Sequence, residues 1–313
     1  MKKPRIVSLL PSCTEIVCEL GLREQLVGRS HECDFPPAVR RLPACTRPKL
    51  NVQAASLQID REVNALLQDA LSIYQIDAGK LKQLRPDFIL TQSQCEVCAV
   101  SLSEVEQAVS GWGGFQPRVL SLAPSALADV WNDIRKVAGA LGVAVRGVEL
   151  VERLKHRVES IAARTRPLPQ RPSVACIEWL DPLMAAGNWV PELVELAGGL
   201  NLFGEGGKHS SWLNWESVRE RDPEIMVILP CRFDIERTRR EMSSLTDRPG
   251  WKSLRAVKNG GVYLADGNRF FNRPGPRLVE SLEILAALIH PAVFTSGHEG
   301  VGARKAASEF LRG

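Results

Sequence analysis

A long amphipathic helix with strand and helix units on both sides is the feature that most constrains the fold. Apolar side chains recur every three or four residues over residues 145–161. This spacing predicts one helix of about 20 residues, roughly 30 Å long at about 1.5 Å per residue. A proline-rich run at residues 166–172 ends it. Because 313 residues exceed what one hydrophobic core usually holds, we expect this helix to join two lobes.

Short apolar strands alternate with helices in both halves of the chain, and this alternation favours parallel sheets. The strands are expected at residues 5–10, 26–29, 88–91 and 118–122 in the first half, and at residues 173–177, 225–230 and 261–264 in the second. The predicted fold is therefore α/β, with two lobes whose central sheets are mostly parallel, joined by one long rigid interlobe helix. The expected domains are an N-terminal lobe (1–124), a connecting helical region (125–168) and a C-terminal lobe with its tail (169–313).

Local signals set some of the expected boundaries. Residues 11–12 are expected to form a turn before a helix that begins at Thr14. Ser103 and Glu106 have the spacing of a capping box, which predicts that another helix begins there. The Gly-rich C-terminal tail is expected to be peripheral and to end in a short polar helix from Ala303.

Composition and charge exclude several classes of protein. With 44% hydrophobic residues the chain is not disordered, and no apolar stretch approaches the ~18 residues that a membrane-spanning helix needs. Lys and Arg total 40 against 36 for Asp and Glu, so the formal net charge is only +4. We therefore expect no nucleic-acid partner and no insertion into a membrane.

The first residues and the cysteines both favour the cytoplasm. The apolar run after Met1 is too short for a signal peptide, contains Pro11 and meets Glu15 without a cleavage site. The eight cysteines indicate free thiols in a reducing compartment, because a chain of this size needs no disulfides. The expected location is cytoplasmic, and periplasmic only if the chain is a processed form.

The loops that follow the strands hold the candidate binding residues, since ligands of open α/β sheets bind beyond the carboxyl ends of the strands. Large rings at such positions suit a bulky, flat, partly apolar ligand. The candidates are Pro11, Ser12, Cys13, His31 and Glu32 in the first half, and Trp179, Asp181, Trp212, Phe233, Asp266, Phe270 and Arg273 in the second.

Motifs for catalysis are missing, which favours a protein that is not an enzyme. The sequence has no G-x-S-x-G, no G-x-G-x-x-G after a strand and no H-E-x-x-H. An enzyme would need an acid–base pair such as Glu32 with Asp34 or Glu96. Solvated or structural carboxylates are the simpler interpretation of those residues.

A cluster of histidine and cysteine is the alternative site. His31, Cys33, Cys95 and Cys98 lie on two loops of the first half, and three thiols with one imidazole could hold zinc or iron. The simpler interpretation is that these small side chains shape the wall of a pocket. A third interpretation is redox chemistry at Cys98, which precedes a helix whose dipole would favour the thiolate.

Several segments in the same order resemble the cobalamin-, haem- and siderophore-binding proteins that serve ABC importers. The resemblance covers most of residues 5–290 and is carried by residues 5–15 (RIVSLLPSCTE), 84–90 (LRPDFIL), 210–218 (SSWLNWESV), 222–228 (DPEIMVI) and 256–263 (AVKNGGVY). The loops at residues 30–34 and 94–98 are similar to a subgroup often labelled cobalamin-binding.

The resemblance implies a two-lobed binding protein with a rigid interlobe helix. It implies ligand contacts at residues 11–13, in the loop after the strand that ends near residue 228, and at residues 266–273. The leading hypothesis is non-catalytic binding of cobalamin or another corrinoid in the interlobe cleft, with the permease of an ABC transporter as partner. A cytoplasmic version would instead carry, sense or protect its ligand. The alternative remains a zinc- or iron-binding protein.

Overall fold

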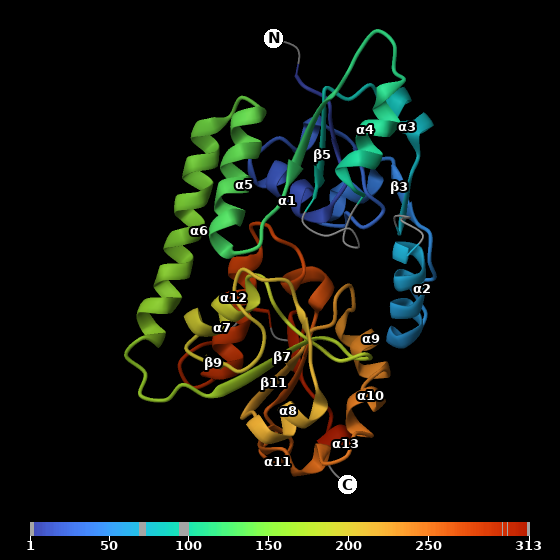
Figure 1. The fold of residues 1–313 in the computed structure, drawn as a ribbon. Coiled ribbons are helices and arrows are strands. Elements are labelled where there is room, and N and C mark those ends of the chain that lie inside the picture. The colour runs from blue at the N-terminus through green and yellow to red at the C-terminus, as the bar shows by residue number, and fades with distance from the viewer. Residues whose placement is uncertain (1–2, 69–72, 94–99, 296, 299, 312–313) are drawn as a thin grey trace. The chain divides into compact units, whose positions relative to one another are not determined.

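Two central sheets, one in each half of the chain, organise the fold (Figure 1). The computed structural model describes residues 3–68, 73–93, 100–295, 297–298 and 300–311. Contacts divide the chain into an N-terminal unit (Met1–Ala54, Gln58–Pro124 and Ala128–Arg153) and a C-terminal unit (Ala55–Leu57, Ser125–Leu127 and Leu154–Gly313). Helix α6 (Ala144–Thr165) supplies residues to both. The predicted class, α/β with two lobes and mostly parallel sheets, is confirmed.

The sheet of the N-terminal unit is parallel throughout the part of the chain that the structure describes. Its strand order is β2 (Leu26–Arg29), β1 (Ile6–Ser8), β5 (Phe88–Gln92) and β6 (Arg118–Leu122). Ile6, Ile89 and Leu90 are fully buried, as expected of strands that are covered on both faces.

Helices and a small two-stranded sheet complete this unit. The helices are α1 (Pro11–Glu19), α2 (Ser56–Gln68), α3 (Ala78–Leu84), α4 (Leu102–Ser110) and α5 (Leu127–Ala140), with the start of α6. Strands β3 (Thr46–Pro48) and β4 (Tyr74–Ile76) pair antiparallel. Short 3₁₀ turns η1 (Arg23–Gln25) and η2 (Pro37–Arg41) flank β2.

The sheet of the C-terminal unit has a parallel centre and antiparallel edges. Its order is β10 (Ser211–Trp212), β8 (Met184–Ala185), β7 (Ser173–Trp179), β11 (Ile225–Ile228), β12 (Val262–Ala265) and β13 (Ala303–Lys305), with β9 (Leu200–Asn201) also on β7. Strands β7, β11 and β12 run parallel, whereas β8, β10 and β13 are antiparallel to their neighbours.

The helices of the C-terminal unit pack around this sheet. They are α7 (Val190–Leu196), α8 (Trp215–Arg221), α9 (Ile235–Arg240), α10 (Ser243–Thr246), α11 (Arg255–Lys258), α12 (Leu278–Ile289) and α13 (Ser308–Leu311). A 3₁₀ turn, η3 (Trp251–Ser253), precedes α11, and a π-helical turn, η4 (Gly267–Phe271), follows β12. Trp251, Met226 and Leu264 belong to the core of this unit.

Three expected boundaries were wrong. Residues 11–12 are the first turn of α1 and not a turn before it, since proline at the first helical position costs no hydrogen bond. The capping box uses Ser101 with Glu104, two residues before the expected pair. This earlier start places Val105 and Val109 on one buried face.

The third correction concerns the C-terminal tail. Residues 303–305 form strand β13, which pairs with β12, and not a polar helix. The Ala306 N–H donates to the Val262 oxygen at 2.9 Å, so the segment satisfies backbone groups at the edge of β12.

Asp133 is a buried carboxyl group on α5. It is 8% exposed, and its Oδ2 has no hydrogen-bond partner within the described chain. Burial raises the pKa of Asp133 to about 6, opposed by the positive charge of Lys136. The folded protein therefore binds this proton more tightly than the unfolded chain.

We expect Asp133→Asn to stabilise the protein at pH 8. The ordinary pKa of 3.8 rises to about 6 on folding, so the free energy of unfolding falls as the pH rises from 4 through 6. Removing the buried charge should raise it by about 1–2 kcal/mol at pH 8 and by much less at pH 4. Urea unfolding at both pH values measures this, with Glu149→Gln at an exposed position as the matched control. Equal effects of the two variants would contradict it.

Candidate functional site

The carboxyl ends of β7, β11 and β12 form one continuous edge in the C-terminal unit. The Cys231 N–H, just after β11, donates to the Glu178 oxygen of β7 at 3.0 Å. The Asn268 N–H, after β12, donates to the Phe233 oxygen at 3.1 Å. Segments that are far apart in the sequence are therefore held together by their own backbones, as the parallel order requires.

Two tryptophans and a methionine lie side by side at this end of the sheet. Met184 pairs with Trp179 on one side and with Trp212 on the other. Residues directly opposite in a regular antiparallel pair project from the same face of a sheet, with Cβ atoms about 4.5–5.5 Å apart, and this applies to Met184 and Trp212. The pairing of Trp179 with Met184 follows a register shift between Ile177 and Trp179. Trp212 is 59% exposed, whereas Trp179 and Met184 are half-buried. We call Trp179, Met184 and Trp212 the aromatic row.

The ring of Phe233 packs against the ring of Trp179 in the aromatic row. Its ring centroid lies 5.3 Å from that of Trp179, and the guanidinium carbon of Arg237 lies 3.9 Å from the Phe233 centroid. Phe233 is 1% exposed, so it holds Trp179 in place and offers little surface itself. The indole N–H of Trp179 donates to the Asp181 oxygen at 3.1 Å, which further fixes the ring.

The π-helical turn η4 lies next to Phe233 and begins after Asp266. The Asp266 carboxylate accepts the Arg269 N–H at 2.8 Å. Burial nevertheless raises the pKa of Asp266 to about 6. Phe270 and Arg273 are almost fully buried, whereas Asn268 and Arg269 are half-buried. The partly accessible polar groups of this turn are therefore an amide and a guanidinium, which lie within the predicted segment 266–273 but were not named individually.

In the N-terminal unit, the segments after β1, β2 and β5 also meet at one edge. The Ser30 N–H donates to the Ser8 oxygen at 2.8 Å, and the Leu9 N–H donates to the Leu90 oxygen at 2.9 Å. Of the candidates here, Pro11, His31 and Glu32 are half-buried. Ser12 and Cys13 are buried in the first turn of α1, and burial raises the pKa of Cys13 well above its ordinary value.

His31 and Cys33 are both held by hydroxyl groups. His31 Nδ1 lies 2.8 Å from Thr46 Oγ1, and Cys33 Sγ lies 3.0 Å from Thr14 Oγ1. Cys33 is 1% exposed, and the carboxylate of Glu32 accepts the Tyr74 hydroxyl at 3.3 Å.

The predicted metal cluster falls only partly within the described chain. Cys95 and Cys98 lie outside the described residues. Among the residues that are described, no group of three or more His, Cys, Asp and Glu side chains is placed to hold a metal ion. The cysteines that the structure describes as free thiols are Cys13, Cys18, Cys33, Cys45, Cys176 and Cys231.

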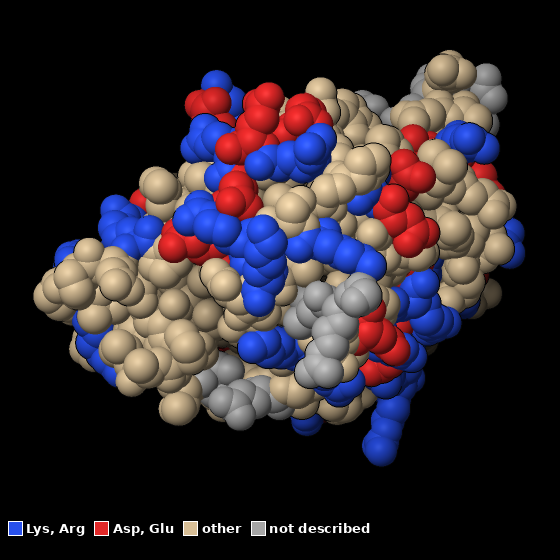
Figure 2. All heavy atoms as spheres, turned by 90° about the horizontal axis from the view of Figure 1, so that it is seen from below, with Lys and Arg blue, Asp and Glu red and all other residues tan. Residues whose placement is uncertain are grey.

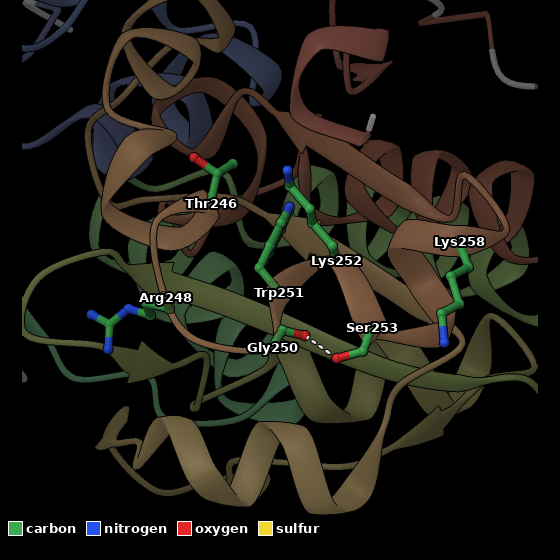
Figure 3. A pocket seen from close by; sticks show the side chains of 7 residues that line it. All are labelled: Thr246, Arg248, Gly250, Trp251, Lys252, Ser253 and Lys258. Carbon is green, nitrogen blue, oxygen red and sulfur yellow. Dashed lines mark hydrogen bonds between the residues drawn. The ribbon is translucent and has the colours of Figure 1, made fainter. Parts of the chain in front are cut away.

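A cavity of about 450 Å³ lies in the C-terminal unit. It is lined by Thr246, Arg248, Gly250, Trp251, Lys252, Ser253 and Lys258, from segments that precede β12 (Figure 3). The side chains of Arg248, Lys252 and Lys258 point in different directions and do not converge (Figure 3). None of the predicted binding residues lines this cavity, although the Arg248 guanidinium donates to the oxygen of Leu180, the residue after Trp179, at 3.3 Å.

Charged side chains of both signs are mixed on the face shown in Figure 2. Arginines of the C-terminal unit are paired with acids, such as Arg255 with Asp222 at 3.1 Å and Arg219 with Glu216 at 2.6 Å. None of the helices in the described ranges is long and apolar enough to cross a membrane.

We expect Gly267→Ala to disturb η4. A Cβ at this position would lie 2.2 Å from the Pro230 oxygen and 2.5 Å from the Leu229 oxygen, so the turn would have to move away from β11. The free energy of unfolding should fall by about 1–3 kcal/mol, as for other overpacked positions. Urea unfolding measures this. Gly206→Ala, where a Cβ meets no described atom, is the control and should cost less; a cost as large as that of Gly267→Ala would contradict the packing argument.

Curated relatives match almost the whole chain. A Bacillus subtilis protein described as an uncharacterized ABC transporter substrate-binding lipoprotein is 24% identical over 299 residues, covering 94% of this chain and 82% of the relative. The vitamin B12-binding protein of Vibrio vulnificus is 22% identical over 281 residues, covering 89% of this chain and 87% of the relative.

Solved structures share the fold. A periplasmic haem-binding protein from Pseudomonas aeruginosa has a TM-score of 0.70 at 22% identity, covering 93% of this chain and 94% of the other. The periplasmic vitamin B12-binding protein of Vibrio cholerae has a TM-score of 0.65 at 19% identity, covering 92% and 97%.

The expected cytoplasmic location was wrong. The relatives include a lipoprotein, and the similar structures are of periplasmic proteins. The expectation rested on the first residues, but residues 6–8 form β1 of the central sheet, so this segment reports on the fold and not on the compartment.

A family model for periplasmic binding proteins matches residues 6–268, which is most of the chain and includes both strand-end edges. The chain therefore belongs to the periplasmic binding protein family.

Proposed function

We propose that this protein is the substrate-binding subunit of an ABC importer and that it binds cobalamin or another corrinoid without chemical change. The aromatic row of the C-terminal unit is the observation that carries the proposal. It offers two indole rings and a thioether on neighbouring strands at one end of the sheet, and the buried Phe233 packs against Trp179.

The size and polarity of the row suit a flat macrocycle. Two cross-strand steps of about 5 Å separate Trp179 from Trp212, which is the scale of a polycyclic ring system and larger than a sugar or an amino acid. Rigid aromatic surfaces bind such rings with little loss of side-chain entropy. Asn268, whose N–H donates to the Phe233 oxygen, and Arg269 are half-buried, and in this proposal they supply hydrogen bonds to the polar substituents of the ring.

Cobalamin is favoured over haem on chemical grounds. Cobalamin carries its own axial ligand to cobalt, so stacking and hydrogen bonding are sufficient to hold it. Seven curated relatives carry the description vitamin B12-binding protein. Haem-binding proteins occur among the similar structures, which makes haem the competing ligand for any test.

The proposed role places the protein outside the cytoplasmic membrane, where it hands its ligand to a permease. The protein then needs recognition and release only. This role fits a strand-end edge that offers aromatic rings, an amide and a guanidinium.

Titration of the purified protein with cobalamin, and separately with haem, tests the proposal. We expect saturable 1:1 binding of cobalamin by calorimetry and absorbance, tighter than that of haem. Trp212→Ala should weaken it about tenfold, since a stacked ring contributes about 1–2 kcal/mol beyond its neighbours. Trp212 is exposed, so the variant should fold normally.

Leu200→Ala is the matched control. Leu200 is also an exposed apolar residue of this sheet, at 48% exposure, but it pairs with Ser173 at the opposite end of β7. Its replacement should leave the affinity unchanged. Binding of neither ligand at high micromolar concentration, or equal losses in the two variants, would contradict the proposal.

A further inference from the structure

We infer that Trp189 and Ser281 are positioning residues that hold the turn η4 in its ligand-facing conformation. The inference rests on the proposed function, because η4 carries the half-buried Asn268 and Arg269, and the Asn268 N–H donates to Phe233, which packs against Trp179 of the aromatic row. Neither Trp189 nor Ser281 lies on an accessible surface, at 5% and 0% exposure. Both donate hydrogen bonds to backbone oxygens of the turn from buried positions.

Prolines that follow η4 limit the backbone N–H groups that could donate to two of its carbonyl oxygens. In the turn, the Asn272 N–H donates to the Gly267 oxygen at 3.0 Å, with the i to i+5 spacing of a π-helix. The residue four positions after Phe270 is Pro274, and the residue five positions after Phe271 is Pro276. Proline has no N–H, so the Phe270 oxygen loses its α-helical (i+4) donor and the Phe271 oxygen loses its π-helical (i+5) donor. The N–H of Gly275 is the one other helical position for each oxygen.

Two buried side chains donate hydrogen bonds to these two carbonyl oxygens. The indole N–H of Trp189, the residue before α7, donates to the Phe271 oxygen at 2.8 Å. The Ser281 hydroxyl, on α12, donates to the Phe270 oxygen. Leaving a buried carbonyl without a donor lowers the free energy of unfolding by more than an ordinary hydrogen bond contributes to it. Each of the two hydrogen bonds therefore holds the turn in position.

The front of the turn is fixed by its neighbours as well. The Asp266 carboxylate caps the Arg269 N–H, and the Asn272 amide donates to the Gly267 oxygen at 2.9 Å. Removing the Trp189 or Ser281 donor should therefore loosen the turn without unfolding the unit. The loosened Asn268 and Arg269 would then meet the ligand at an entropic cost.

Trp189→Phe tests the inference, with Trp251→Phe as a closely matched control. Trp251 is buried in the same unit, and its indole N–H likewise donates to a backbone oxygen, that of Phe310, at 2.9 Å. It lies on η3, which precedes β12, and its ring stacks on that of Trp215. The two variants lose the same kind of bond, so their thermal stabilities should fall alike.

The two variants should differ in binding and in local exchange. Trp189→Phe should weaken cobalamin binding by about threefold to tenfold, the scale of one hydrogen bond, and Trp251→Phe should not. Hydrogen exchange of the peptide spanning η4 should accelerate by a similar factor in Trp189→Phe alone. Ser281→Ala should reproduce both effects and replaces Trp189→Phe if that variant does not fold.

Equal affinities of the Trp189→Phe and Trp251→Phe variants would overturn the inference and leave the proposed function standing. If the wild-type protein binds neither cobalamin nor haem, the proposed function fails. The exchange measurement still decides the inference in that case, because unchanged exchange at η4 in Trp189→Phe would overturn it.

Discussion

The parallel order of β7, β11 and β12 is the constraint on which the candidate site depends. Parallel strands end at the same edge of a sheet, so the segments that follow them must share that edge. Backbone hydrogen bonds between these segments, such as that from Asn268 to Phe233, hold them together. The proposed function can then reside in the side chains at this edge, including Trp179 at the end of β7, while the buried side chains earlier in the strands form the core.

The antiparallel strands at the edge of the sheet contribute two of the three side chains of the aromatic row. Strands β8 and β10 are only two residues long, yet they place Met184 and Trp212 in line with Trp179. At the same edge, prolines after η4 remove one helical donor from each of two carbonyl oxygens, and Trp189 and Ser281 donate to those oxygens. The proposed binding surface is held in place because buried side chains donate hydrogen bonds to its backbone oxygens.

The sequence predicted the parts of this arrangement that local patterns determine. The alternation of strands and helices predicted the α/β class, and the strand-end rule led to Trp179, Phe233 and Asp266. The pattern could not show that Phe233 is buried beneath Trp179, because burial depends on packing from distant segments. Met184 was missed because its role depends on pairing between short strands about 27 residues apart, for which no periodic signal exists. The predicted compartment was wrong because the opening residues, which were interpreted as a signal about location, form strand β1 of the central sheet.

A crystal structure of the protein with cobalamin bound is the most direct test of the central claim. The account predicts the corrin ring against the aromatic row, in van der Waals contact at about 3.5–4 Å with Trp179 and Trp212, with Asn268 or Arg269 at its edge. A corrin ring that binds elsewhere, for example at the cavity lined by Arg248, Lys252 and Lys258, would contradict it.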